Sequence, residues 1–151
     1  MGVSVRINTE HNRGAPRQAV WWWTKLLPLL LWIVMILWVA SRPKTTFFPS
    51  EMKTILGMPR EFLQYPYHFG AFFILAVLFR RCLPPAIHRL GGWKIAVFPL
   101  LGCAAVSLCS ELLQLYVPTR TPAVRDLAVD QSGAVLAITL MRHFSEKLFR
   151  V

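Results

Sequence analysis

The sequence predicts an all-α integral membrane bundle of four transmembrane helices with both termini in the cytoplasm. The chain has 151 residues, of which 55% are hydrophobic and only 16% charged, and its mean hydropathy is +0.46. Soluble domains carry about 25% charged residues. The 17 Lys and Arg residues outnumber the 7 Asp and Glu residues and flank apolar stretches instead of gathering on one surface. This distribution is typical of multispanning membrane proteins and argues against nucleic-acid binding.

The first apolar stretch, residues 21–40, predicts a retained membrane anchor. A bilayer core about 30 Å thick takes about 20 helical residues to cross. Tryptophans lie at both ends of this stretch, as in the aromatic belts of membrane interfaces. Cleavage after Ala40, as in a signal peptide, is disfavoured because Trp38 occupies a position that needs a small residue. Residues 1–20 are expected to form a polar, basic N-terminal tail.

Three further spans are predicted at residues 66–83, 93–117 and 122–141. Arg80 and Arg81 end the apolar part of the second. The fourth begins with Thr121 as N-cap and Pro122 at the first helical position. Only a few residues separate the third span from the fourth, so these two helices are expected to be antiparallel neighbours. We expect residues 21–143 to form one domain and residues 144–151 a short C-terminal tail.

The distribution of Lys and Arg predicts the orientation. A cytoplasmic N-terminus places eleven of the 17 cations inside, namely Arg6, Arg13, Arg17, Lys25, Arg80, Arg81, Arg89, Lys94, Arg142, Lys147 and Arg150. The remaining six then lie outside, namely Arg42, Lys44, Lys53, Arg60, Arg120 and Arg125. Because positive residues favour the cytoplasmic side, this orientation is preferred to its inverse.

Polar side chains follow one face of each of the last two predicted spans. An ionisable residue at mid-bilayer costs roughly 2.5–3.5 kcal/mol, so each one needs a partner or a function. On the third span these polar residues are Ser107, Ser110, Glu111 and Gln114. On the fourth span Asp126 and Asp130 are followed, at helical spacing, by the small residues Gly133, Ala134 and Ala137. Small residues permit close packing of membrane helices.

Depths estimated from the helical rise bring three of these side chains to one layer. At 1.5 Å per residue, Glu111 lies about 10 Å and Asp130 about 12 Å below the outer helix ends. His68 lies about 18 Å above the inner surface. In a core about 30 Å thick, this leaves about 12 Å between His68 and the outer surface. Arg120, in the short loop between the last two spans, is expected to lie above this layer and to pair with its carboxylates.

The last two spans resemble a known family. The stretch SELLQLYVPTRTPAVRDLAVDQSGAVL is similar to the signature of the VanZ-like family of small bacterial membrane proteins, and HFGAFF is similar to an upstream motif of that family. The resemblance covers Tyr65 to about Ala137. Its matching positions are His68, Phe69, Phe72, Glu111, Gln114, Pro118, Arg120, Asp126, Asp130 and Gly133. Two departures are Gln64 and Tyr65, where the family has an Asp and Lys pair, and Asp130, where the family has Asn.

The resemblance implies a multi-pass protein of the bacterial cytoplasmic (inner) membrane that lowers susceptibility to teicoplanin. Our first hypothesis is an outward-facing polar pocket that binds a lipid head group or an amphiphilic antibiotic. The residues of this pocket or polar network are His68, Ser110, Glu111, Gln114, Arg120, Arg125, Asp126 and Asp130. Expected partners are the lipid bilayer, an anionic lipid or lipid-linked cell-wall precursor, and a second copy of the chain in a homo-oligomer.

Three alternatives stay open. The first is an intramembrane enzyme acting on a lipid-linked phosphate or ester, with Glu111, Asp130 and His68 as candidate catalytic groups. The second is a small transporter or proton path. The third is purely structural: Glu111, Arg120 and Asp126 join helices, while Tyr65 and Tyr67 act as interfacial anchors.

No cofactor and no metal are expected. The sequence lacks a glycine-rich nucleotide loop, clustered metal ligands and a serine-nucleophile motif. Cys82, Cys103 and Cys109 show no metal or redox spacing and are assigned to packing.

Overall fold

The computed structural model describes residues 15–43, 60–88, 93–118, 120 and 123–148. These residues form four long helices and one short one, with no strand among them: α1 Ala15–Ala40, α4 Arg60–Cys82, α5 Pro85–His88, α6 Lys94–Gln114 and α7 Val124–Leu148. The all-α prediction is confirmed for this part of the chain. Thr121 and Pro122 lie outside the described residues, as do many of the cations used to predict the orientation.

Two of the long helices are long and apolar enough to cross a membrane. They are α1, over residues 23–40, and α6 over its whole length. The helices also run beyond the predicted spans, since α1 begins at Ala15, α4 at Arg60 and α7 ends at Leu148. Pro66 therefore lies inside α4. The crossing of the membrane by α4 and α7, which would give four spans with both termini in the cytoplasm, remains a prediction.

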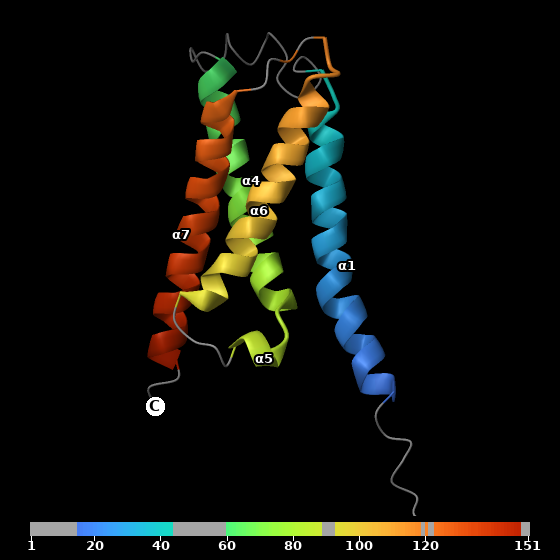
Figure 1. Ribbon diagram of the computed structural model, residues 1–151, viewed down its shortest axis with the longest axis vertical. Helices are drawn as coiled ribbons and strands as arrows, with labels where there is room; N and C mark the ends of the chain where they lie inside the picture. Colours follow the sequence, from blue (N-terminus) through green and yellow to red (C-terminus); the bar gives the residue numbers. More distant parts are fainter. Residues whose placement is uncertain (1–14, 44–59, 89–92, 119, 121–122, 149–151) are drawn as a thin grey trace, which may run out of the picture.

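The four long helices lie side by side along the longest axis of the molecule (Figure 1). Helix α4 packs against each of the other three and most extensively against α7. Helices α6 and α7 pack against each other in antiparallel directions. The start of α1 and the end of α7 lie at one end of the bundle, together with α5, while the α6–α7 connection lies at the opposite end (Figure 1).

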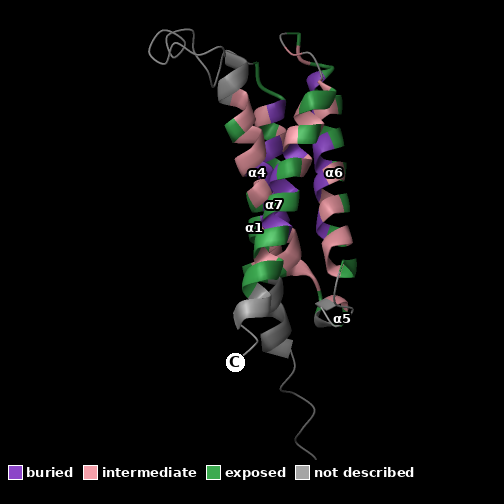
Figure 2. Ribbon diagram, turned by 90° about the vertical axis from the view of Figure 1, so that its left-hand side faces the viewer, coloured by how far each residue is buried: buried purple, intermediate pink, exposed green. Residues whose placement is uncertain are grey.

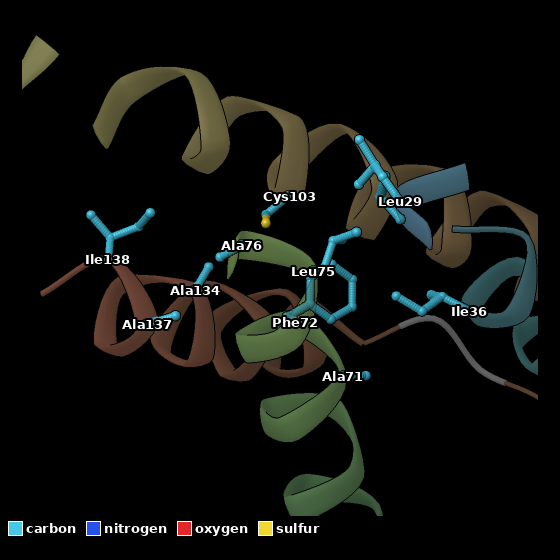
Figure 3. Packing of buried hydrophobic residues seen from close by; sticks show 11 residues of the cluster. Leu29, Ile36, Ala71, Phe72, Leu75, Ala76, Cys103, Ala134, Ala137 and Ile138 are labelled. Carbon is cyan, nitrogen blue, oxygen red and sulfur yellow. The ribbon is translucent and has the colours of Figure 1, made fainter. Parts of the chain in front are cut away.

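The core between the helices consists of apolar and mostly small side chains. Phe72, Leu75 and Ala76 of α4 are almost fully buried and meet Cys103 of α6 (Figure 3). The rest of this cluster comes from all four long helices: Leu29, Ile36, Ala71, Val106, Ala134, Ala137 and Ile138. Small side chains at the α7 positions let this helix approach α4 closely.

Helix α1 is joined to α4 by two polar contacts. The indole Nε1 of Trp32 donates to the Ala71 carbonyl oxygen at 2.9 Å. Nearer the N-terminus of α1, the Cys82 thiol donates to the Lys25 carbonyl oxygen at 3.1 Å. Both bonds use a backbone carbonyl as acceptor, so they fix the position of α1 without adding a charge to the interior.

The outer surface of the bundle is apolar and its interior contains polar groups. Exposed and intermediate residues lie on the outward faces of the helices, and buried residues face inward (Figure 2). Leu31 and Val34 of α1 and Leu101 of α6 are each more than 60% exposed. Ser107, Ser110, Gln114 and Asp130 are buried. A soluble protein rarely presents so much contiguous apolar surface, whereas contact with lipid accounts for it.

Candidate functional site

A buried polar contact joins three helices. Nδ1 of His68, on α4, lies 2.9 Å from Oδ1 of Asp130, on α7. The hydroxyl of Ser107, on α6, donates to Oδ2 of the same carboxylate. Asp130 and Ser107 are both fully buried. The structure thus brings together His68 and Asp130, two of the three residues expected at one depth, and adds Ser107 to them.

Close backbone packing of α4 and α7 places this contact. A Cβ atom at Gly133 would lie 2.2 Å from the backbone oxygen of Phe69. Gly133 follows Asp130 by three residues, on the same face of α7, and Phe69 is the neighbour of His68. The glycine therefore lets the two helices approach until the His68 ring reaches the Asp130 carboxylate.

The Glu111 carboxylate binds the start of a helix, unlike the Asp130 carboxylate, which binds His68 and Ser107. Its Oε2 accepts the backbone N–H of Ala123 at 2.9 Å, at the beginning of α7. Its Oε1 lies 3.4 Å from the side-chain nitrogen of Gln114, a long hydrogen bond. The first N–H groups of a helix lack partners within the helix and carry partial positive charge. Glu111 therefore caps α7 and joins it to α6.

Arg120 is held by the end of α1. Its Nε donates to the Arg42 carbonyl oxygen at 2.9 Å, and its Nη2 donates to the Val39 carbonyl oxygen at 3.1 Å. The last carbonyls of a helix lack partners within the helix and carry partial negative charge, and the Val39 carbonyl oxygen also accepts the backbone N–H of Arg42 at 3.1 Å. Arg120 therefore connects the α6–α7 loop to α1. Contrary to the expectation, no ion pair joins Arg120 to Glu111, Asp126 or Asp130 in the part of the chain that the structure describes.

Partial burial lowers the pKa of the Arg120 guanidinium, while Tyr67, Asp126 and Glu111 nearby oppose this shift. Because the ordinary pKa of an arginine lies far above neutral pH, Arg120 keeps its charge at neutral pH. The outer end of the bundle therefore holds a permanent, partly buried cation.

The other charged candidates lie at the start of α7. Asp126 is partly buried in the first turn, where its negative charge is favourable to the helix dipole. Arg125 is exposed. Neither is among the residues that line the recess described next.

A small recess opens between α1, α4 and α6 beside the His68–Asp130 pair. Its volume is about 20 Å³, enough for a single water molecule. Its polar lining consists of Tyr67, His68, Ser110, Gln114 and Arg120, and its apolar lining of Ile36, Val39, Ala40, Ala71 and Phe72. Ile36, Ala71 and Phe72 belong to the buried cluster in Figure 3.

Tyr67 is the one polar residue lining this recess that was not predicted to belong to the polar site. Its hydroxyl is buried and has no hydrogen-bond partner among the described residues. An unpartnered buried polar group is rare and requires an explanation, such as a bound molecule. Tyr67 was predicted to be an interfacial anchor because it lies near the end of a predicted span. Nothing in the sequence at such a position indicates that the hydroxyl is buried.

The described residues contain no group of three or more His, Cys, Asp or Glu side chains arranged to hold a metal ion. The three cysteines are free. Cys103 is fully buried in the apolar core.

Comparison with known proteins identifies the family. The family model VanZ/LLP1 matches residues 24–145, which include every residue of the polar contact and of the recess. No curated protein and no solved structure matches the chain. The match covers most of the chain, and the two apolar helices agree with a location in a membrane. The chain therefore belongs to the VanZ-like family of membrane proteins.

Proposed function

We propose that this VanZ-like membrane protein binds the anionic head group of an amphiphile at the recess between α1, α4 and α6. The amphiphile is an anionic lipid, a lipid-linked cell-wall precursor or teicoplanin itself, and its capture lowers teicoplanin susceptibility. One observation carries the proposal: the partly buried Arg120 cation stands beside a buried Tyr67 hydroxyl that has no protein partner.

Arg120 keeps donors for a ligand. A guanidinium has five N–H groups, and the bonds to Val39 and Arg42 use two of them. The remaining donors can bind a phosphate or carboxylate, for which the planar guanidinium is better suited than a lysine ammonium. Because the two carbonyl bonds hold the side chain in place, little rotamer entropy is lost on binding.

The size of the recess limits what enters it. A volume of about 20 Å³ admits one oxygen atom of a head group, and the rest of the ligand must stay at the mouth. An oxygen atom in the recess can accept a hydrogen bond from the Tyr67 hydroxyl. His68 and Gln114 also line the recess. In the predicted orientation the mouth is extracytoplasmic, where cell-wall precursors and glycopeptide antibiotics meet.

Binding can be tested with purified protein in phosphatidylcholine nanodiscs. Short-chain phosphatidylglycerol and teicoplanin are titrated separately, so that a lipid ligand is distinguished from an antibiotic. We expect Tyr67→Phe to weaken binding about five- to tenfold, which corresponds to one lost hydrogen bond of about 1–1.5 kcal/mol. Tyr116→Phe, at an exposed tyrosine outside the recess, is the matched control.

Tyr67→Phe is informative because the hydroxyl has no protein partner, so its removal should leave the melting temperature unchanged or raised. Arg120→Lys should weaken binding tenfold or more, as expected for a lost charge-assisted bond of about 1.5–3 kcal/mol. Arg142→Lys, at an exposed position at the other end of α7, controls for charge. Wild-type affinity for both ligands in Tyr67→Phe and Arg120→Lys would overturn the proposal.

The resistance phenotype needs its own measurement. Expression in a susceptible host should raise the inhibitory concentration of teicoplanin more than that of vancomycin, which lacks the acyl chain. At matched membrane levels, Arg120→Lys should lose most of the effect. Full activity of Arg120→Lys would show that a point charge suffices and would overturn the claim that the ligand needs the planar guanidinium.

A further inference from the structure

The Asp130 carboxylate fixes the tautomer of His68. An ionised carboxylate only accepts hydrogen bonds. Ser107 donates to Oδ2 of Asp130, and Nδ1 of His68 lies 2.9 Å from Oδ1, so the Nδ1 proton points towards the carboxylate. A carboxylate that holds Nδ1–H determines which ring nitrogen can still take up or release a proton. In His68 that nitrogen is Nε2, which carries the lone pair of the neutral ring.

Nε2 of His68 is accessible, whereas Nδ1 faces the buried Asp130. Nε2 has no hydrogen-bond partner among the described residues. It is also absent from the described side-chain atoms that are both buried and unpartnered, which are the Tyr67 hydroxyl and the Gln131 amide nitrogen. The His68 side chain is 11% exposed and lines the recess, while Asp130 is fully buried and does not line it. The ring therefore meets the recess with its titratable side.

The other charges near His68 are mostly negative. The charged groups that act on its imidazole are three carboxylates, those of Asp130 and Asp126 on α7 and of Glu111 on α6. Arg120 is the one Lys or Arg among the described residues that line the recess, and the lining from α1 is apolar. The neighbouring Tyr67 contributes a neutral hydroxyl. While the His68 ring is neutral, negative groups therefore outnumber the single guanidinium.

An anionic oxygen in the recess favours the protonated form of His68. The recess has room for one ligand oxygen, which then lies against the walls. The lone pair of neutral His68 repels such an oxygen, and so do the carboxylates nearby. The imidazolium ion instead offers an N–H at Nε2 and a positive charge, while Nδ1–H keeps its bond to Asp130. An anion at this place therefore strengthens the binding of a proton to His68.

From this arrangement we propose that the recess binds its anionic head group together with one proton, which Nε2 of His68 takes up. The inference rests on the proposed binding of an anionic amphiphile and adds the condition under which it occurs. The proton comes from the solvent and returns to it when the ligand leaves. Because linkage is reciprocal, the proton and the head group strengthen each other's binding by the same factor. In the predicted orientation the external pH controls the occupancy of the site.

The affinity for the head group should therefore fall as the pH rises. The range to measure is about pH 5 to pH 9, around the ordinary pKa of histidine. Short-chain phosphatidylglycerol is a suitable probe, because its phosphodiester does not titrate in this range. Since the ligand favours protonated His68, binding is strongest at low pH and weakens where the bound His68 loses its proton. The steepest part of the curve should approach about a tenfold loss of affinity per pH unit.

Titration calorimetry of the full chain in phosphatidylcholine nanodiscs counts the protons, when it is performed in two buffers of different ionisation enthalpy. On the steep part of the curve we expect an uptake of about one proton per ligand. His68→Gln should take up none, should bind with no dependence on pH, and should bind about tenfold more weakly at the acidic end. The matched control is His143→Gln, at an exposed position near the end of α7, which should behave like the wild type.

Two further variants test which carboxylate acts on the proton. Asp130→Asn keeps an acceptor for Nδ1–H and removes the charge beside the imidazolium, so the fall in affinity should begin about one pH unit lower or more. A curve identical to that of the wild type would overturn the role of Asp130. Glu111→Gln should still take up a proton, because its carboxylate is not the group that we assign. Loss of the uptake in folded Glu111→Gln would overturn the assignment to His68.

Two results overturn the coupling and leave the proposed binding function intact. One is phosphatidylglycerol binding by the wild type with constant affinity over the whole pH range and no proton uptake. The other is unchanged uptake in folded His68→Gln. Thermal melting shows whether each variant is folded, and the proton count of the wild type decides the question if His68→Gln is not. Absence of binding of both phosphatidylglycerol and teicoplanin at every pH would overturn the binding proposal itself.

Discussion

A single buried carboxylate organises the interior of this bundle. Asp130 is fully buried and receives hydrogen bonds from His68 on α4 and Ser107 on α6. Burying a charge is costly unless it is paired and hydrogen-bonded. Here both carboxylate oxygens have a partner, each from a different helix. The cost is thereby reduced, and the same contacts fix the relative depth of α4, α6 and α7.

Ser107→Ala should destabilise the protein by about 1 kcal/mol, the upper part of the range for side-chain hydrogen bonds between membrane helices. Its hydroxyl is one of two donors to Asp130. Ser132→Ala is the matched control, because the Ser132 hydroxyl is exposed and bonds within its own helix to the Val129 carbonyl. Unfolding in mixed detergents would measure the difference. Equal stability of the two variants would mean that the Ser107 bond adds nothing.

The residues of the site were only partly predictable. Polar side chains at helical spacing in an apolar stretch led to Ser110, Glu111 and Gln114, because such residues are expensive in a membrane. The hydrogen-bond partners of the site residues could not be predicted from such spacing. Arg120 bonds to carbonyls 78 and 81 residues away in the sequence. Every helix end offers such carbonyls, so the sequence did not specify which end would lie beside the loop.

At the scale of elements, two helix ends are completed by side chains from elsewhere. Glu111 of α6 accepts an N–H at the start of α7, and Arg120 donates to carbonyls at the end of α1. Both ends lie at the end of the bundle that carries the α6–α7 connection (Figure 1). Glu111 and Arg120 have opposite charges and were expected to pair with each other. Each instead bonds near a helix terminus of opposite partial charge.

Glu111→Ala should therefore cost about 1 kcal/mol, the usual loss on removing a helix N-cap. Glu111→Gln should cost less, since an amide oxygen still accepts the Ala123 N–H and only the favourable charge at the helix start is lost. Hydrogen exchange at the first turn of α7 would report the change locally. The opposite order, with Gln more damaging than Ala, would contradict the capping role.

The contact between α4 and α7 depends on one glycine. Gly133→Ala would place a Cβ 2.2 Å from the Phe69 backbone oxygen, which cannot move without moving α4. We expect a destabilisation of about 3 kcal/mol or more, the high end for overpacking, and loss of the His68–Asp130 contact. Measurement is by yield of folded protein and thermal melting.

Two other glycines provide graded controls. Gly102→Ala meets only the Phe79 ring, at 2.7 Å, and that side chain can rotate, so the cost should be smaller. Gly70→Ala meets nothing within 4 Å and should be neutral or slightly stabilising, because Ala favours a helix. A cost for Gly133→Ala as small as that for Gly70→Ala would contradict the close packing of α4 and α7.

At the scale of the whole molecule, sequence arithmetic predicted which segments are helical better than where each helix begins and ends. Apolar length identified α1, α4, α6 and α7 because each needs about 20 residues to cross a bilayer. The helices nevertheless continue beyond the predicted spans, to Arg60 in α4 and Leu148 in α7. A helix need not end where the bilayer does, since backbone hydrogen bonds persist in water. Hydropathy therefore predicts which segment crosses the membrane, and it does not predict where the helix ends.

The orientation of the recess follows from the number of crossings and can be tested by cysteine labelling. Tyr116 lies in the α6–α7 connection, whereas Ala86 in α5 and His143 near the end of α7 belong to elements at the opposite end of the bundle, and all three residues are exposed. If α4 and α7 both span, Tyr116→Cys should react with a membrane-impermeant maleimide in intact cells. Ala86→Cys and His143→Cys should react only after permeabilisation.

The labelling of the wild-type chain, which has three free cysteines, gives the background for each variant. Because α1 and α6 are the helices apolar enough to cross on composition, the His143 position is the decisive one for α7. If His143→Cys and Tyr116→Cys both react in intact cells, α7 does not cross. If the whole pattern is reversed, the recess opens to the cytoplasm, and Arg120 could not meet an antibiotic that acts outside the membrane.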